Sequence, residues 1–155
     1  MPERLAFRPL DLAQVPPDLY GRFDLVFSTG ALARLGGARA AGDYLLAAMR
    51  CLRPGGTAVH VTGFDLGGGA PPVKHGPFWL RAADMEQITR RLHRAGYRMK
   101  PVDLDPGAGL LDQFVDQPAE RPGWPLRAPD GTPQLRALVE GRIVTSVGLV
   151  VQAPG

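Results

Sequence analysis

Two short segments end in small and polar residues that could bind a ligand. The apolar segment 23–29, FDLVFST, is too short for a helix and is predicted to be a buried strand, and TAVHVTGF at 57–64 is the next strand. The residues at and after these ends are Ser28, Thr29, Gly30, Thr62, Gly63, Phe64 and Asp65. In open α/β sheets, ligands bind in the crevice beyond the carboxyl ends of the strands. These two ends are therefore a predicted binding site.

One candidate for proton transfer lies within the second strand. His60 stands between Val59 and Val61, and the unperturbed pKa of histidine lies near neutrality, so His60 could act as a general base. The alternative, a hydrogen-bonded histidine that is part of the structure, stays open. Because the 3 histidines lie far apart and Cys51 is alone, no metal site is expected.

A helix is predicted between these two strands. Residues 41–53 place Leu45, Met49 and Leu52 on one helical face. The LRPGG sequence should end this helix, because Pro54 cannot continue it and a following glycine can adopt the left-handed turn that closes it.

Further strands and a second helix follow. A helix is predicted within residues 80–96, with Asp84 and Gln87 as a capping box, and strands are predicted at 97–104 and 142–152. The resulting alternation of strands and helices is an α/β pattern.

A long segment rich in proline and glycine interrupts this order. Residues 105–134 are expected to form a lid or loop within a single domain that spans residues 1–155. The aromatic residues Phe114 and Trp124 favour a packed lid, because disordered segments are poor in aromatic residues.

Composition places the chain among globular, intracellular proteins. The chain has 155 residues, of which 45% are hydrophobic and 21% charged, and its formal net charge is +3. The arginines are mostly scattered, which makes nucleic-acid binding a weak hypothesis. A single cysteine, Cys51, together with the lack of a signal-peptide segment or a long apolar run, predicts a cytoplasmic location without membrane attachment.

In this order, the motifs resemble the second half of a class I S-adenosylmethionine-dependent methyltransferase, most closely a bacterial subgroup. FRPLDL resembles the end of that family's third strand, FDLVFSTGALARL its fourth strand, and CLRPGGTAVHVTGFDL a helix and the fifth strand. AGYRMKPVDLDPG and VTSVGLVVQ resemble the sixth strand and the antiparallel seventh. The expected fold is α/β, a partial Rossmann-like sheet, mostly parallel with an antiparallel C-terminal strand, whose first two strands are missing.

The resemblance implies roles for residues at the strand ends. Asp11 would accept a hydrogen bond from the adenine amino group of the cofactor S-adenosylmethionine, and the backbone N–H of Leu12 would face the ring. Ser28, Thr29 and Gly30 match positions beside the methionine portion, and His60, Thr62, Phe64 and Asp65 match the side of the methyl acceptor. The acceptor itself cannot be named. For Asp11 and Asp65, an ordinary turn residue is the alternative.

Several positions depart from the family pattern. Ala33 and Arg34 stand where the subgroup has Glu-His, while Gly63 replaces a glutamate and Asp65 an asparagine. These losses support a second hypothesis, a non-catalytic remnant that acts as an interaction module or as one part of a split enzyme.

The family's glycine-rich cofactor turn should lie upstream of Met1 and is not in this chain. Without the first two strands, the strand at 23–29 should have an open edge, and RLAFRPL at 4–10 either dangles or pairs with that edge. Open edges invite association, so a homodimer or a partner chain is expected there.

Overall fold

The computed structural model describes residues 6–67, 77–105, 107–109, 112, 115–116, 136–139 and 141–155. The elements in chain order are η1 (Pro17–Leu19), β1 (Phe23–Thr29), η2 (Leu32–Arg34), α1 (Ala38–Met49), β2 (Leu52–Asp65), α2 (Ala82–Arg94), β3 (Arg98–Met99), β4 (Val115–Asp116), β5 (Arg136–Val139) and β6 (Arg142–Gln152). Together the strands form one 6-stranded sheet.

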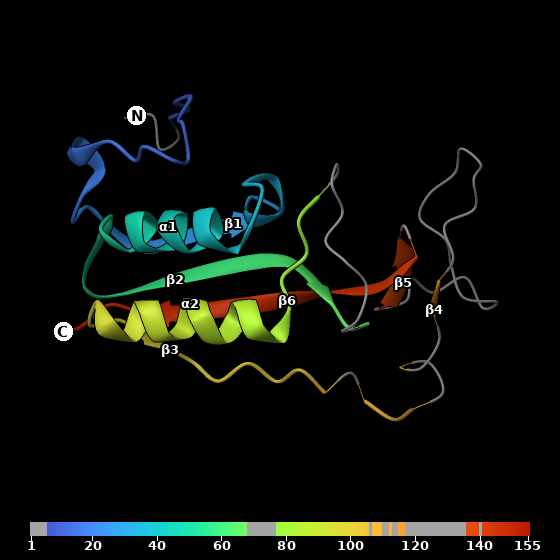
Figure 1. Ribbon diagram of the computed structural model, residues 1–155. Coiled ribbons are helices and arrows are strands. Elements are labelled where there is room, and N and C mark those ends of the chain that lie inside the picture. The colour runs from blue at the N-terminus through green and yellow to red at the C-terminus, as the bar shows by residue number, and fades with distance from the viewer. Residues whose placement is uncertain are drawn as a thin grey trace.

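The sheet has one reversed strand. Its order is β1-β2-β6-β5-β4, and β3 also pairs with β6 (Figure 1). Strand β6 is antiparallel to β2, β3 and β5, whereas β1 is parallel to β2 and β4 is parallel to β5. The other described strands thus share one direction, and the predicted antiparallel C-terminal strand is confirmed.

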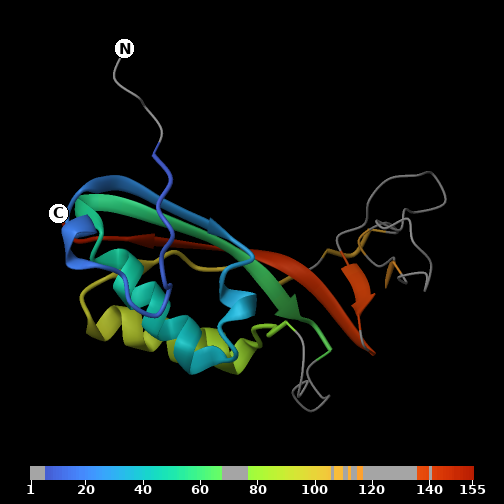
Figure 2. The same cartoon turned by 90° about the horizontal axis from the view of Figure 1, so that it is seen from above.

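Both α-helices lie on the same face of the sheet (Figure 2). Because successive side chains of a strand point to opposite faces, alternate residues of β2 and β6 meet the helices. Ala58 and Phe64 of β2 and Leu149 of β6 are buried there, together with Leu45 of α1 and Leu92 of α2. This single layer of helices against strands is the hydrophobic core.

The opposite face of the sheet carries exposed apolar side chains near β1. Leu25 is 60% exposed and Phe27 is 61% exposed. In the register of the sheet, Phe27 pairs with Val59 of β2, and Val59 pairs with Val150 of β6. We call this surface, made by Leu25, Phe27, Val59, Val61 and Val150, the bare face. No described element covers it.

Strand β1 is an edge of the sheet, as the sequence predicts. It pairs with β2 and with no other described strand, and residues 6–12 form no strand. The alternative in which the N-terminal segment pairs with this edge is therefore wrong for the described residues 6–10. Within the described part of the chain, no helix is long and apolar enough to cross a membrane.

Two of the predicted strands match the structure in their bounds, and the helix predicted within residues 80–96 is observed as α2. The strands at 23–29 and 142–152 are confirmed as β1 and β6, but the strand at 97–104 shrinks to Arg98–Met99. Most of the predicted lid at 105–134 lies outside the described residues.

The predicted helix end at LRPGG is wrong in detail. Helix α1 already ends at Met49, and β2 begins at Leu52. The reason is the pairing of this segment with β1. Leu52 pairs with Phe23, and the next pair along the two strands is Thr57 with Leu25. The residues between Leu52 and Thr57 therefore bulge out of the ladder instead of capping the helix.

The capping box of α2 is also shifted. Arg81 is the N-cap residue, and its backbone N–H donates to Oδ2 of Asp84 at 3.0 Å. Asp84 is thus the third residue of the helix and not its cap, while Gly96, at φ 86°, follows the helix end as expected.

A buried ion pair fastens the end of β2 to the start of β6. Nη1 of Arg142 lies 2.5 Å from Oδ2 of Asp65, and the side chains are 5% and 1% exposed. Nε of Arg81 lies 3.5 Å from the same oxygen. The other oxygen of Asp65 accepts from the backbone N–H of Gly67 at 2.9 Å. One carboxylate therefore joins two strands and the start of α2.

This ion pair predicts a large loss of stability when one partner is removed. Asp65→Asn leaves the guanidinium of Arg142 buried without a countercharge, and we expect the free energy of unfolding to fall by about 3 kcal/mol. Asp24→Asn breaks the exposed Asp24–Arg53 pair, with side chains 79% and 54% exposed, and should cost less than about 1 kcal/mol. Urea unfolding of both variants makes the comparison, and equal losses would contradict the assignment.

Candidate functional site

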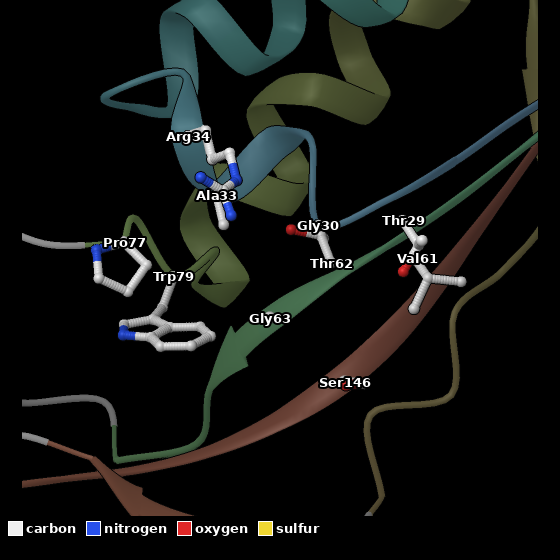
Figure 3. Close-up of a pocket in the computed structure, with 10 residues that line it drawn as sticks. All are labelled: Thr29, Gly30, Ala33, Arg34, Val61, Thr62, Gly63, Pro77, Trp79 and Ser146. Carbon is white, nitrogen blue, oxygen red and sulfur yellow. The ribbon is translucent and has the colours of Figure 1, made fainter.

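The ends of β1 and β2 meet at one cavity. The strands are parallel, Thr29 is the register partner of Val61, and the backbone N–H of Gly30 donates to the carbonyl of Val61 at 2.9 Å. Beyond these residues β1 turns away into η2, and a cavity of about 760 Å³ opens (Figure 3). Its lining residues are Thr29, Gly30, Ala33, Arg34, Val61, Thr62, Gly63, Pro77, Trp79 and Ser146. This confirms that the two predicted strand ends run side by side and share a cleft.

Trp79 forms one wall of the cavity. The backbone N–H of Leu80 donates to the carbonyl of Gly63 at 3.0 Å, and Leu80 forms a parallel bridge with Phe64. This pairing brings the preceding residue, Trp79, against the end of β2. A Cβ atom on Gly63 would collide with Cε3 and Cζ3 of the indole. Gly63 therefore leaves the space that the indole fills.

Trp79 is a lining residue that the sequence patterns do not predict. Its position depends on the bridge between Phe64 and Leu80, which are far enough apart in the chain that no local pattern shows it. The available signal was Gly63 itself, because a glycine inside a strand often marks a close approach.

Thr62 lies in the cavity lining, but its hydroxyl oxygen is buried. The residue is 3% exposed, and Oγ1 has no hydrogen-bond partner among the described residues. Less than 1 Å² of this oxygen is exposed, so a ligand in the cavity reaches it only if the side chain moves.

Arg34 supplies the charge of the cavity. It lies in η2 and is exposed, and it is the one charged residue among the described residues of the lining. The neighbouring Ala33 accepts a hydrogen bond from the backbone N–H of Phe78 at 2.8 Å, which ties η2 to the segment that carries Trp79. The two walls of the cavity are thus linked through the backbone.

His60 lies behind the cavity, in the core. It is 0% exposed, its Nδ1 is 2.7 Å from Oγ of Ser28, and its ring makes an edge-on contact with Tyr44 at 5.7 Å between centroids. Burial lowers the pKa of His60 to about 4, so the ring is neutral at pH 7. His60 and Ser28 do not belong to the cavity lining.

Four other predicted site residues lie elsewhere. The carboxylate of Asp11 accepts from the backbone N–H of Ala13 at 2.9 Å, which is the geometry of a turn. Leu12 packs against the core, and Phe64 belongs to it. Asp65 is held in the buried ion pair described above.

Thr29 and Gly30 fit a cofactor at the cavity. Gly30 has φ 67°, and nothing lies within 4 Å of the Cβ atom that another residue would carry there. A glycine with open space above it lets a ligand approach the backbone closely. The described residues therefore leave room for a ligand beside Thr29 and Gly30. Among these residues, no group of three His, Cys, Asp or Glu could hold a metal ion.

Comparison with known proteins identifies a fold. No protein-family model matches the chain, and no curated protein matches it in sequence. Among solved structures, the [4+2]-cyclase SpnF aligns with 99% of this chain and 57% of its own, with a TM-score of 0.57 and 14% identity.

Methyltransferases are also among the structural neighbours. The antibiotic-resistance methyltransferase Kmr aligns over 94% of this chain and 60% of its own, with a TM-score of 0.48 and 18% identity. A methyltransferase described as putative, from Bacillus halodurans C-125, covers 94% and 70%, with a TM-score of 0.47 and 12% identity. The chain thus spans less than two thirds of SpnF and of Kmr, and the likeness to SpnF shows that the two proteins share an α/β fold. At these identities the likeness concerns the fold and not the reaction.

Proposed function

We propose that this chain is part of an S-adenosylmethionine-dependent methyltransferase that acts on a small acceptor in the cytoplasm. The observation that carries the proposal is the cavity at the ends of β1 and β2, where Gly30 and Thr62 face one space. This is the place where ligands bind in open α/β sheets. The cofactor, when bound, supplies an activated methyl group.

The residues of the chain then have to hold and align the two ligands. Thr29 and Gly30 would hold the methionine end of the cofactor, and Thr62 would orient the acceptor. Alignment of this kind can supply a large part of the catalysis, because the reacting groups no longer have to find each other. His60 is assigned a positioning role, since its contact with Ser28 fixes the end of β1.

The second candidate is an interaction module, or one part of a split enzyme. The observation that favours it is the bare face next to the open edge of β1, where Leu25 and Phe27 are 60% and 61% exposed. A partner chain, or a second copy, could cover these side chains and extend the sheet. An interaction module needs no cofactor, and one part of a split enzyme would bind it only together with its partner.

Cofactor binding separates the two candidates. We expect isothermal titration of the chain with S-adenosylmethionine and S-adenosylhomocysteine to show binding, and Gly30→Leu to weaken it by about tenfold or more, because the new side chain would occupy the open space. Gly21→Leu is the matched control, since Gly21 has φ 63° and equally open surroundings but lies outside the cavity lining. Both variants should lose similar stability, and only Gly30→Leu should lose binding. No heat from the unmodified chain at millimolar cofactor would favour the second candidate.

The low pKa of His60 gives a separate prediction. In the unfolded chain its pKa should be about 6.5. Between that value and the folded pKa of about 4, the unfolded state binds a proton that the folded state does not, so stability falls as the pH drops through this range. We expect a loss on the order of 3 kcal/mol for the native chain that is absent in His60→Gln.

Urea unfolding from pH 7 to pH 4 measures this difference. His93→Gln, at an exposed position of α2, is the control and should keep the pH dependence of the native chain. If His60→Gln and the native chain lose stability in parallel, then His60 titrates near neutrality, and the general-base hypothesis gains over the positioning role.

A further inference from the structure

The chemistry of the cavity lining restricts the acceptor. The described lining combines one aromatic side chain and one cation, which belong to Trp79 and Arg34. In Figure 3, Arg34 and Trp79 lie on one side of the view, and Thr29 and Val61 lie on the other.

The indole of Trp79 offers a flat apolar surface that is fixed in place. Gly63 admits the ring against β2, and the hydrogen bond from Leu80 to Gly63 holds the backbone beside it. Aromatic rings prefer offset-stacked or edge-to-face partners, and such pairs stabilise contacts beyond their buried area. This wall therefore favours a planar ring.

Arg34 selects an anion. No described residue forms an ion pair with it, although Asp18, Asp24, Asp43, Asp65 and Glu86 all pair with other arginines. A guanidinium binds carboxylates and other planar anions through paired hydrogen bonds. An uncompensated arginine on the wall of a cavity thus favours a negatively charged ligand.

Among the described residues, the lining holds no base. None of its residues is an Asp, Glu, His, Lys, Cys or Tyr, and His60 is buried behind it with a pKa of about 4. An acceptor that must lose a proton to a protein side chain finds no receiver among these residues. An acceptor that is already ionised in water needs none, and Arg34 would stabilise it in that form.

We infer that the cavity binds a planar aromatic acid, whose ring stacks on Trp79 while its anionic group pairs with Arg34. The inference rests on the proposed function in taking this ligand as the methyl acceptor. Its binding, however, can be measured without the cofactor and without any reaction.

The test uses the indole of Trp79 as the reporter. The chain has 2 tryptophans, so Trp124→Phe leaves Trp79 as the single indole N–H signal in a nitrogen-15 NMR spectrum. This chain is titrated with 2-naphthoate, with the uncharged 2-naphthamide, and with the non-aromatic cyclohexanecarboxylate. We expect 2-naphthoate to shift the signal with an affinity about tenfold higher than that of the amide, which corresponds to one charge-assisted contact. Cyclohexanecarboxylate should leave the signal in place.

Two variants locate the contacts. Arg34→Gln should weaken 2-naphthoate to the level of the amide, whereas Arg94→Gln, an exposed arginine of α2 outside the cavity lining, should change nothing. Gly63→Ala should displace the indole and weaken both aromatic probes. Its control is Gly148→Ala, because Gly148 lies on the same face of the adjacent strand and nothing stands within 4 Å of a Cβ there.

The outcomes distinguish this inference from the proposed function. Equal affinities for 2-naphthoate and 2-naphthamide, or an indole signal that no probe moves, overturn the inference even if the chain binds S-adenosylmethionine. Binding of 2-naphthoate that depends on Arg34, without any heat from the cofactor, supports the ligand class and removes methyl transfer as its purpose.

Discussion

The parallel pairing of β1 and β2 is the constraint on which the site depends. It places Thr29 beside Val61 and lets both strands end at the same edge of the sheet. Because β1 stops there while β2 continues to Asp65, the last residues of β2 lack a strand neighbour on that side. The segment at Leu80 takes this place by pairing with Phe64. The cavity is thus the space left between a strand that ends and the segment that replaces it.

Two arginines near the end of β2 differ in their surroundings. Arg142 is buried and neutralised by Asp65, so it fixes where β2 ends and β6 begins. Arg34 stands in the cavity wall without an ion pair to any described residue. A charged side chain that is paired in the core, such as Arg142, holds parts of the structure together. A charged side chain without a partner at a cavity, such as Arg34, can bind a ligand. The difference between the two sites is one of burial and partners, not of residue type.

The sequence was sufficient where local patterns decide the structure. Strands β1 and β6 match the predicted 23–29 and 142–152, because apolar, β-prone segments bounded by glycine or charge have few alternatives. The sequence was insufficient where pairing between residues far apart in the chain determines the structure. The pairing of Leu52 with Phe23 converts the predicted helix end into strand, and the place of Trp79 depends on a bridge that no local pattern encodes. Thr29, Gly30 and Thr62 line the described cavity because they stand at the predicted strand ends, and their roles remain predictions.

His60, the candidate base, is part of the buried core. Strand alternation turns the side chains of Ala58, His60 and Phe64 toward the helices, so the face that makes β2 a core strand also buries the imidazole. The part of β2 that lines the cavity begins at Val61, one residue after His60. The same periodicity that builds the core therefore keeps the imidazole of His60 out of the cavity lining that the structure describes.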